Sequence, residues 1–196
     1  MSPNLVLASS SPYRATLLKR LGVAFVCIAP EIDETPNYSE TIDDYIKRLS
    51  IAKAQAAARL INEAALIIAS DQSATYKGEI IGKPLTKDRA IEQLLSFSGQ
   101  SVTFKTGVCV LNSESGNYDY ALAEYSVKFR TLSRDEVARY VEKDNPLDCA
   151  GSFKCESLGV ALFESMSGDD PTSLEGLPLI KTCKLLHNHG FDPLKH

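Results

Sequence analysis

Residues 64–72 have the sequence AALIIASDQ. The run from Ala64 to Ala69 is apolar and has the length of one strand, as expected for a strand that is covered on both faces. Ser70, Asp71 and Gln72 follow it directly. Because ligands of α/β sheets usually bind at the carboxyl ends of strands, this segment predicts both an α/β fold and the place of a site.

Strand and helix patterns alternate before this segment. Asn4 to Ala8 predicts a strand, which a serine-rich turn connects to a helix that Gly22 ends. Val23 to Ile28 predicts a second strand. Apolar residues at helical spacing predict a helix over 42–60, which the capping pattern Thr41-x-x-Asp44 begins.

The second half of the chain predicts a hairpin and further helices. The expected elements are a helix over Thr86 to Phe97, hairpin strands over Ser101 to Leu111 and Tyr118 to Arg130, a helix from the capping box Ser133-x-x-Glu136 to before Asn145-Pro146, a strand over Val160 to Phe163 and a helix from about Leu174 to His189. We therefore expect one α/β domain over residues 1–196, with a twisted mixed sheet and two lobes around a central cleft.

Composition excludes several classes of protein. The chain has 196 residues, of which 44% are hydrophobic and 23% charged, which is an ordinary globular profile rather than that of a disordered chain. A net charge of −4 offers little attraction for a polymeric phosphate backbone, so no nucleic-acid polymer is expected as a partner.

Cysteine and histidine usage narrows the possibilities further. The five cysteines form no C-x-x-C pair, which indicates reduced cytosolic thiols rather than a disulfide framework or a zinc knuckle. No stretch approaches the roughly 18 apolar residues that span a bilayer, and no basic segment precedes the first apolar run, so we expect a cytoplasmic protein without a membrane partner. All three histidines, His187, His189 and His196, lie near the end of the chain, which disfavours a His-centred triad or a multi-His metal site.

Two loops are candidates for chemistry. The turn that contains Ser11 and Arg14 offers hydroxyls, free helix amides and a guanidinium, which together suit a phosphate group. The alternative is a serine N-cap beside a surface arginine. The acidic loop with Asp33 and Glu34 is either a second part of the site or a solvated surface loop.

Three further residues complete the candidate set. Asp71 either caps the next turn or works in a site, because a carboxylate after an apolar strand needs a partner. Lys53 interrupts an apolar helical stripe, where it either snorkels or holds a phosphate, and Lys83 lies on the stiff turn Gly82-Lys83-Pro84, as an ordinary turn lysine or a site residue. This set of carboxylates, lysines and an arginine, without histidine, matches metal-assisted attack on a polyphosphate.

Six segments, in order along nearly the whole chain, resemble the Maf family of nucleotide pyrophosphatases. They are Leu7 to Arg14, Pro30 to Thr35, Ser70 to Gln72, Gly82 to Leu85, Cys149 to Phe153 and Gly176 to Leu179. Each motif alone is weak, but six in sequence are specific. The resemblance implies a Maf/Ham1-like, inosine triphosphatase-like fold and hydrolysis of a nucleoside triphosphate to a monophosphate and diphosphate, with a divalent cation, Mg²⁺ or Mn²⁺.

The same resemblance implies a role for each candidate residue. Asp71 would be the general base for the attacking water and, with Glu34, a ligand of the metal. The phosphate groups would be bound by Ser11, Arg14, Lys53 and Lys83. These cations would neutralise the charge that the transition state spreads over the phosphoryl oxygens.

Three positions depart from the commonest pyrimidine-specific members of the family. Tyr13, Gln72 and Glu156 stand where arginine, threonine and glutamine are typical, and they resemble the YceF-like subgroup, whose implied substrate is 7-methyl-GTP. Methylation at N7 gives guanine a positive charge, which an aromatic face and a carboxylate both favour. The alternatives are a pyrimidine triphosphate (dTTP, UTP or CTP) pyrophosphatase and a nucleotide-binding regulator of cell division or septum formation. The resemblance also suggests a homodimer.

Overall fold

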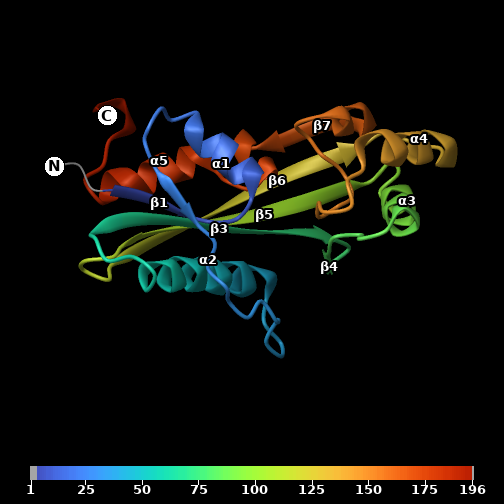
Figure 1. Ribbon diagram of the computed structural model, residues 1–196. Helices are drawn as coiled ribbons and strands as arrows, with labels where there is room; N and C mark the ends of the chain where they lie inside the picture. Colours follow the sequence, from blue (N-terminus) through green and yellow to red (C-terminus); the bar gives the residue numbers. More distant parts are fainter. Residues whose placement is uncertain (1–3, 196) are drawn as a thin grey trace. The chain divides into compact units, whose positions relative to one another are not determined.

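The computed structural model describes residues 4–195, which contain one mixed sheet of seven strands (Figure 1). Its strands are β1 (Asn4–Ala8), β2 (Val26–Ile28), β3 (Ala65–Tyr76), β4 (Glu79–Ile81), β5 (Ser101–Asn112), β6 (Tyr118–Phe129) and β7 (Phe163–Gly168). The order is β2-β1-β3-β5-β6-β7, and β4 pairs with β3. Because β1 pairs in parallel with β2 and β3 while β4 and β7 pair antiparallel with β3 and β6, the prediction of a mixed α/β sheet is confirmed.

Most of the α-helices begin at a capping residue that satisfies a free amide. They are α1 (Pro12–Lys19), α2 (Ile42–Ala58), α3 (Lys87–Ser96), α4 (Arg134–Asp144) and α5 (Leu179–Asn188), with the short 3₁₀ helices η1 (Leu158–Leu162), η2 (Pro171–Glu175) and η3 (Pro193–Lys195). The side chains of Ser11, Thr41, Thr86 and Ser133 accept backbone N–H groups at the starts of α1 to α4.

Two predicted strands have different bounds in the structure. The strand expected over Ala64 to Ala69 continues to Tyr76 as β3, whose last residues, Ala74 to Tyr76, pair with β4. Asp71 therefore lies within a strand, beyond the last residue that pairs with β1, which is Ile68. The strand expected over Val23 to Ile28 is paired only from Val26 as β2.

Two predictions near the end of the chain are wrong in detail. The strand expected over Val160 to Phe163 is extended only at Phe163, the first residue of β7. Its earlier residues belong to η1, which follows a turn in which the amide of Gly159 donates to the carbonyl of Lys154 (3.0 Å). The last helix begins at Leu179 rather than near Leu174, because Gly176 adopts the left-handed conformation (φ +100°) between η2 and α5.

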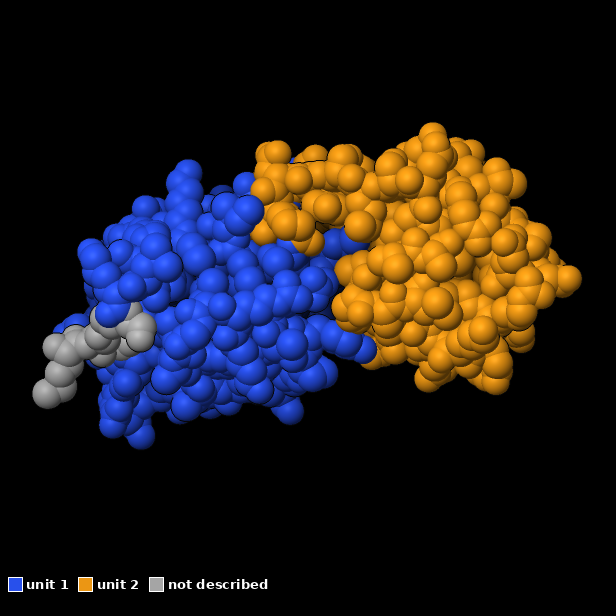
Figure 2. Space-filling model, turned by 90° about the horizontal axis from the view of Figure 1, so that it is seen from above, with its two compact units in different colours: residues 1–72, 106–123, 172–196 blue, residues 73–105, 124–171 orange. Residues whose placement is uncertain are grey.

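The chain divides into two compact units, which Figure 2 shows in different colours. Unit 1 comprises residues 1–72, 106–123 and 172–196, and unit 2 comprises residues 73–105 and 124–171. The predicted central cleft between two lobes stays a prediction.

Unit 1 has three layers. Figure 1 shows α2 on one side of the sheet and α1 and α5 on the other. Along β3 the side chains alternate between these layers: Leu66 and Ile68 pack with residues of α1 and α5, whereas Ile67 and Ala69 pack with residues of α2. A strand buried on both faces explains the continuous apolar run in the sequence.

Unit 2 has an aromatic core beside two helices in contact, α3 and α4. Five phenylalanine rings contact one another with centroid separations of 4.9 to 5.6 Å, mostly edge to face, which is the preferred geometry of aromatic pairs. They are Phe97, Phe104, Phe129, Phe153 and Phe163.

None of the helices within residues 4–195 combines the length and the apolar character that crossing a bilayer requires.

Candidate active site

The alternation of side chains on β3 continues into its polar residues. Asp71 contacts Lys53 of α2, whereas Ser70 and Gln72 form hydrogen bonds with the segment 173–176 in the opposite layer. One strand thus directs functional side chains to both faces of the sheet, at the level where β1 has already ended.

Lys53 joins two carboxylates on the α2 side. Its Nζ lies 2.7 Å from Asp71 Oδ1 and 2.8 Å from Glu34 Oε1. The side chains of Lys53 and Asp71 are only 13% and 10% exposed, whereas that of Glu34 is 56% exposed. The predicted convergence of Glu34, Lys53 and Asp71 is therefore present in unit 1.

Glu34 is held by contacts that α2 makes with its loop. The Tyr45 hydroxyl donates to the Glu34 carbonyl (2.9 Å), and Arg48 Nη2 donates to the Thr35 carbonyl (3.1 Å). Arg48 also forms a two-pronged ion pair with Glu40, and its hydrogen bonds lower the pKa of Glu40 to about 2. The helix thus carries both Lys53 and the groups that fix the loop opposite it.

The sequence analysis did not single out Tyr45 and Arg48. They lie one turn apart on α2, outside the apolar stripe by which the helix was recognised. Burial raises the pKa of Tyr45, and the charges of Asp71 and Glu34 raise it further. The hydrogen bond to the Glu34 carbonyl places the Tyr45 hydroxyl beside the loop that carries Glu34.

The turn after β1 carries Ser11 and Arg14. Ser11 caps α1 by accepting the Arg14 amide (3.4 Å), and Ser9 Oγ accepts the Ser11 amide (3.1 Å). Burial lowers the pKa of Arg14, and the carboxylates of Asp71 and Glu34 oppose this shift. The capping reading of Ser11 is confirmed, while its phosphate-binding role stays a prediction.

The Gln72 side chain forms hydrogen bonds with the segment before α5. Its Nε2 donates to the carbonyls of Ser173 (2.8 Å) and Leu174 (3.1 Å) and to Thr106 Oγ1 (3.0 Å). Because carbonyl oxygens only accept, these contacts fix the orientation of the amide and engage its nitrogen with protein groups. Tyr13 is partly buried on α1. The specificity roles of Tyr13 and Gln72 stay predictions.

Lys83 and Glu156 belong to unit 2, so their contribution to the cluster in unit 1 stays a prediction. Both are exposed: Lys83 follows β4, and Glu156 accepts a hydrogen bond from the Cys155 thiol (3.6 Å). Ser152 forms a hydrogen bond with Gln93 of α3, whose amide donates to the Gly82 carbonyl. The turn that carries Lys83 and the segment before Glu156 are thus joined through α3.

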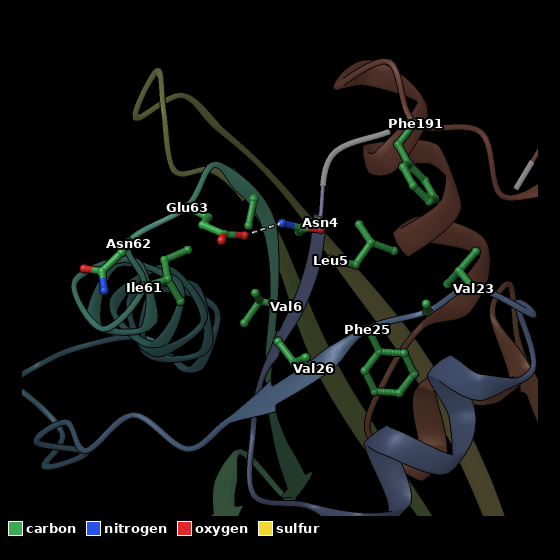
Figure 3. A pocket seen from close by; sticks show the side chains of 12 residues that line it. Asn4, Leu5, Val6, Val23, Phe25, Val26, Ile61, Asn62, Glu63 and Phe191 are labelled. Carbon is green, nitrogen blue, oxygen red and sulfur yellow. Dashed lines mark hydrogen bonds between the residues drawn. The ribbon is translucent and has the colours of Figure 1, made fainter. Parts of the chain in front are cut away.

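A pocket of about 750 Å³ lies elsewhere in unit 1, and none of the predicted site residues lines it (Figure 3). Its lining includes Leu5 and Val6 at the start of β1 and Phe25 and Val26 at β2, and Asn4 Nδ2 donates to a carboxylate oxygen of Glu63 at its edge (3.1 Å). The pocket is at the amino ends of the parallel strands, whereas the carboxylate cluster is beyond the carboxyl end of β1.

The divalent cation expected from the sequence stays a prediction, and Glu34 and Asp71 are the residues that would hold it. Glu34 and Asp71 supply carboxylate oxygens, the hard ligands that Mg²⁺ and Mn²⁺ prefer, and Mg²⁺ commonly takes one or two carboxylates with the phosphates of its substrate. Within residues 4–195 no group of three or more His, Cys, Asp or Glu side chains gathers as a metal site. A cation bound to these two carboxylates would therefore take its other ligands from a substrate or from water.

Comparison with known proteins decides the family. A family model described as "Maf-like protein" matches residues 4–189. The chain belongs to the Maf-like family. Two curated relatives, each named "7-methyl-GTP pyrophosphatase", match along nearly their whole length and support this assignment. The protein from Pseudomonas aeruginosa is 49% identical over 97% of this chain and 98% of the relative, and that from Vibrio parahaemolyticus is 45% identical over 97% of each.

The chain also shares its fold with a solved structure whose name is not Maf. The HAM1 protein from Coxiella burnetii is 17% identical and matches with a TM-score of 0.50, covering 92% of this chain and 99% of that one. At this identity the likeness concerns the fold alone, and it confirms the expectation of a Ham1-like architecture.

Proposed function

We propose that this Maf-like protein is a nucleoside triphosphate pyrophosphatase that hydrolyses 7-methyl-GTP to 7-methyl-GMP and diphosphate. The ion pairs of Lys53 with Asp71 and Glu34, together with Arg14 of the same unit, carry the proposal, because they combine carboxylates for a proton and a cation with positive groups for phosphate. The names of the two relatives support the choice of substrate.

Asp71 is the general base of the proposed reaction. Lys53 binds its Oδ1, and no protein group within residues 4–195 donates a hydrogen bond to its Oδ2. Oδ2 can therefore accept the proton of a water molecule as the water oxygen bonds to the α-phosphorus. The bond from this phosphorus to the bridging oxygen breaks, and the electron pair leaves with diphosphate.

The cations of the chain stabilise the charge that develops during this step. Arg14 and Lys53 offer N–H donors to the phosphoryl oxygens from the two sides of the sheet, and Lys83 would add a further positive charge. A divalent cation bound to Glu34 and Asp71 would neutralise further negative charge on the triphosphate. Ser11 completes the phosphate site with a hydroxyl at the start of α1.

Base recognition is assigned to Tyr13, Gln72 and Glu156. A Tyr13 ring stacked on the cationic 7-methylguanine would contribute about 0.5 to 2 kcal/mol. The Glu156 carboxylate would accept hydrogen bonds from the N1 and N2 donors of guanine, and an unpaired carboxylate would disfavour pyrimidines. Gln72 has its amide oxygen available, because its nitrogen is engaged with the segment 173–174.

A substrate panel tests the proposal. We expect the purified protein with Mg²⁺ or Mn²⁺ to release diphosphate from 7-methyl-GTP with a higher kcat/KM than from GTP, dTTP, UTP or CTP. A preference for pyrimidine triphosphates would refute the substrate assignment in favour of a pyrimidine nucleotide pyrophosphatase. Binding of nucleotides without turnover of any would refute the enzymatic proposal.

The variant Glu156→Gln provides the matched comparison. It keeps the size of the side chain but removes the negative charge, so we expect kcat/KM for 7-methyl-GTP to fall by about tenfold while that for UTP changes little. Equal losses for the two substrates would remove Glu156 from base recognition.

A further inference from the structure

Ser70 is a buried donor for two backbone carbonyls. Its side chain is fully buried in the layer of α1 and α5, and its hydroxyl donates to the carbonyls of Gly107 on β5 (2.7 Å) and Gly176 (2.9 Å). A hydroxyl has one hydrogen, so the two carbonyls share it. This contact ties the segment between η2 and α5 to the centre of the sheet.

The carbonyl of Gly176 has a second donor, the Nε of Arg14, at 2.9 Å. Gly176 has φ +100°, and a Cβ added there would lie 3.4 Å from the same Nε. Any other residue would therefore be strained in this backbone conformation, while its Cβ would be in van der Waals contact with Arg14. The glycine allows its carbonyl to face Ser70 and the guanidinium together.

The hydrogen bond to Nε fixes the plane of the guanidinium. Within residues 4–195, the Nη1 and Nη2 groups of Arg14 form no hydrogen bond or ion pair with protein. The hydrogen bond at Nε therefore fixes the direction in which the two terminal nitrogens point. Two such nitrogens can donate in parallel to two oxygens of a phosphate.

We propose that Ser70 is a positioning residue that orients Arg14 toward the triphosphate through the carbonyl of Gly176. The proposal rests on the function proposed above, in which Arg14 binds phosphate. It gives β3 a double role, because consecutive residues hold the two cations on opposite faces of the sheet: Asp71 holds Lys53, and Ser70 holds Arg14.

A double-mutant cycle of Ser70→Ala and Arg14→Lys tests this role. Lysine keeps the positive charge but has no guanidinium Nε and no planar fork. The Gly176 carbonyl therefore has no guanidinium to orient in the Arg14→Lys variant. We expect Ser70→Ala to lower kcat/KM about tenfold in the wild-type background and less than twofold in the Arg14→Lys background. Ser70→Thr retains the hydroxyl and should recover most of the loss.

The variant Thr182→Val controls for lost stability alone. The Thr182 hydroxyl is also fully buried and donates to a backbone carbonyl, that of Pro178, at 2.8 Å, but it has no hydrogen bond to Gly176 or Arg14. We expect Thr182→Val to lower Tm about as much as Ser70→Ala and to leave kcat/KM within twofold of the wild type.

Calorimetry measures the Kd of inorganic tripolyphosphate for the wild type, the two single variants and the double variant. This binding measurement separates the positioning role of Ser70 from the proposed enzymatic function. Coupling in Kd without turnover of any nucleotide would support the positioning role and refute the proposed function. Equal losses from Ser70→Ala in both backgrounds would overturn the positioning role even in an active enzyme. A wild type that neither binds tripolyphosphate nor cleaves nucleotides would overturn both.

Discussion

At the scale of single residues, the two ion pairs of Lys53 differ in strength. Asp71 is nearly buried, so its charge is stable only beside a partner, and removing that partner would leave a poorly solvated carboxylate. Glu34 is 56% exposed, and an exposed pair contributes about 0 to 1 kcal/mol. Lys53 is therefore bound more firmly by Asp71 than by Glu34, and in the proposed reaction Glu34 would be the carboxylate that exchanges Lys53 for a cation at low cost.

Replacing Asp71 by asparagine removes the proton acceptor while conserving shape. The amide oxygen of asparagine can still accept from Lys53, which also keeps its pair with Glu34, so we expect the fold to be retained. The Asp71→Asn variant should lose about 10²- to 10⁴-fold in kcat, the usual contribution of a general base. Release of diphosphate at saturating nucleotide measures the effect, and circular dichroism checks the fold.

Asp33→Asn is the control for Asp71→Asn. The Asp33 carboxylate accepts the Thr35 amide (2.8 Å) within the same acidic loop, and an asparagine oxygen can take over this contact. We expect its activity to be unchanged. A folded Asp71→Asn protein that kept more than a tenth of the wild-type kcat would exclude Asp71 as the base.

Part of the site could be predicted from single residues. Lys53 and Asp71 stand out because a charge inside an apolar pattern needs a partner, and the structure pairs them. Ser70 and Gly176 could not be found in this way. They meet through a hydrogen bond to a backbone carbonyl 106 positions away, and neither residue type is unusual where it stands.

At the scale of elements, the capping box of α4 makes the free energy of unfolding depend on pH in the acidic range. Glu136 accepts the Ser133 amide and hydroxyl and an Arg130 guanidinium, and these bonds, with that to the Ser133 backbone largest, lower its pKa to about 2. Because the folded pKa is below the unfolded one, this contribution is fully present above about pH 4.5 and is lost as the pH falls toward about 2.

Glu136→Gln should flatten this part of the pH profile. A glutamine side chain keeps an acceptor but does not titrate, so we expect the free energy of unfolding to fall less steeply between about pH 4.5 and 2 than in the wild type. Urea denaturation at a series of pH values measures the slope. Glu114→Gln, at the exposed β5–β6 turn, should leave the slope unchanged, and an unchanged slope in Glu136→Gln would contradict the prediction.

The elements that could be predicted are those with local signals. The caps of α2, α3 and α4 satisfy amides within their own first turn, and these helices begin where the sequence analysis placed them. The extent of β3 depends on pairing with β4, and the start of α5 depends on the left-handed Gly176. These are contacts and backbone angles that hydrophobic periodicity does not encode.

At the scale of the whole molecule, the two units are interleaved along the chain. Unit 1 consists of three segments and unit 2 of two, and the division falls within the strands β3, β5 and β6. A strand that leaves one unit continues into the other through an unbroken backbone. Neither unit is therefore a contiguous domain that could be excised and expected to fold alone.

This interleaving predicts a single cooperative unfolding transition. Val127→Ala in unit 2 and Val110→Ala in unit 1 each remove two methyl groups from a fully buried position, so each should cost about 2 kcal/mol and lower Tm by about 4 to 8 °C. Calorimetry should show one peak in every case, and hydrogen exchange should show that either substitution reduces the protection of both α4 and α5. Two separate peaks, or a Val127→Ala effect confined to α4, would mean that the units unfold independently although their strands are continuous.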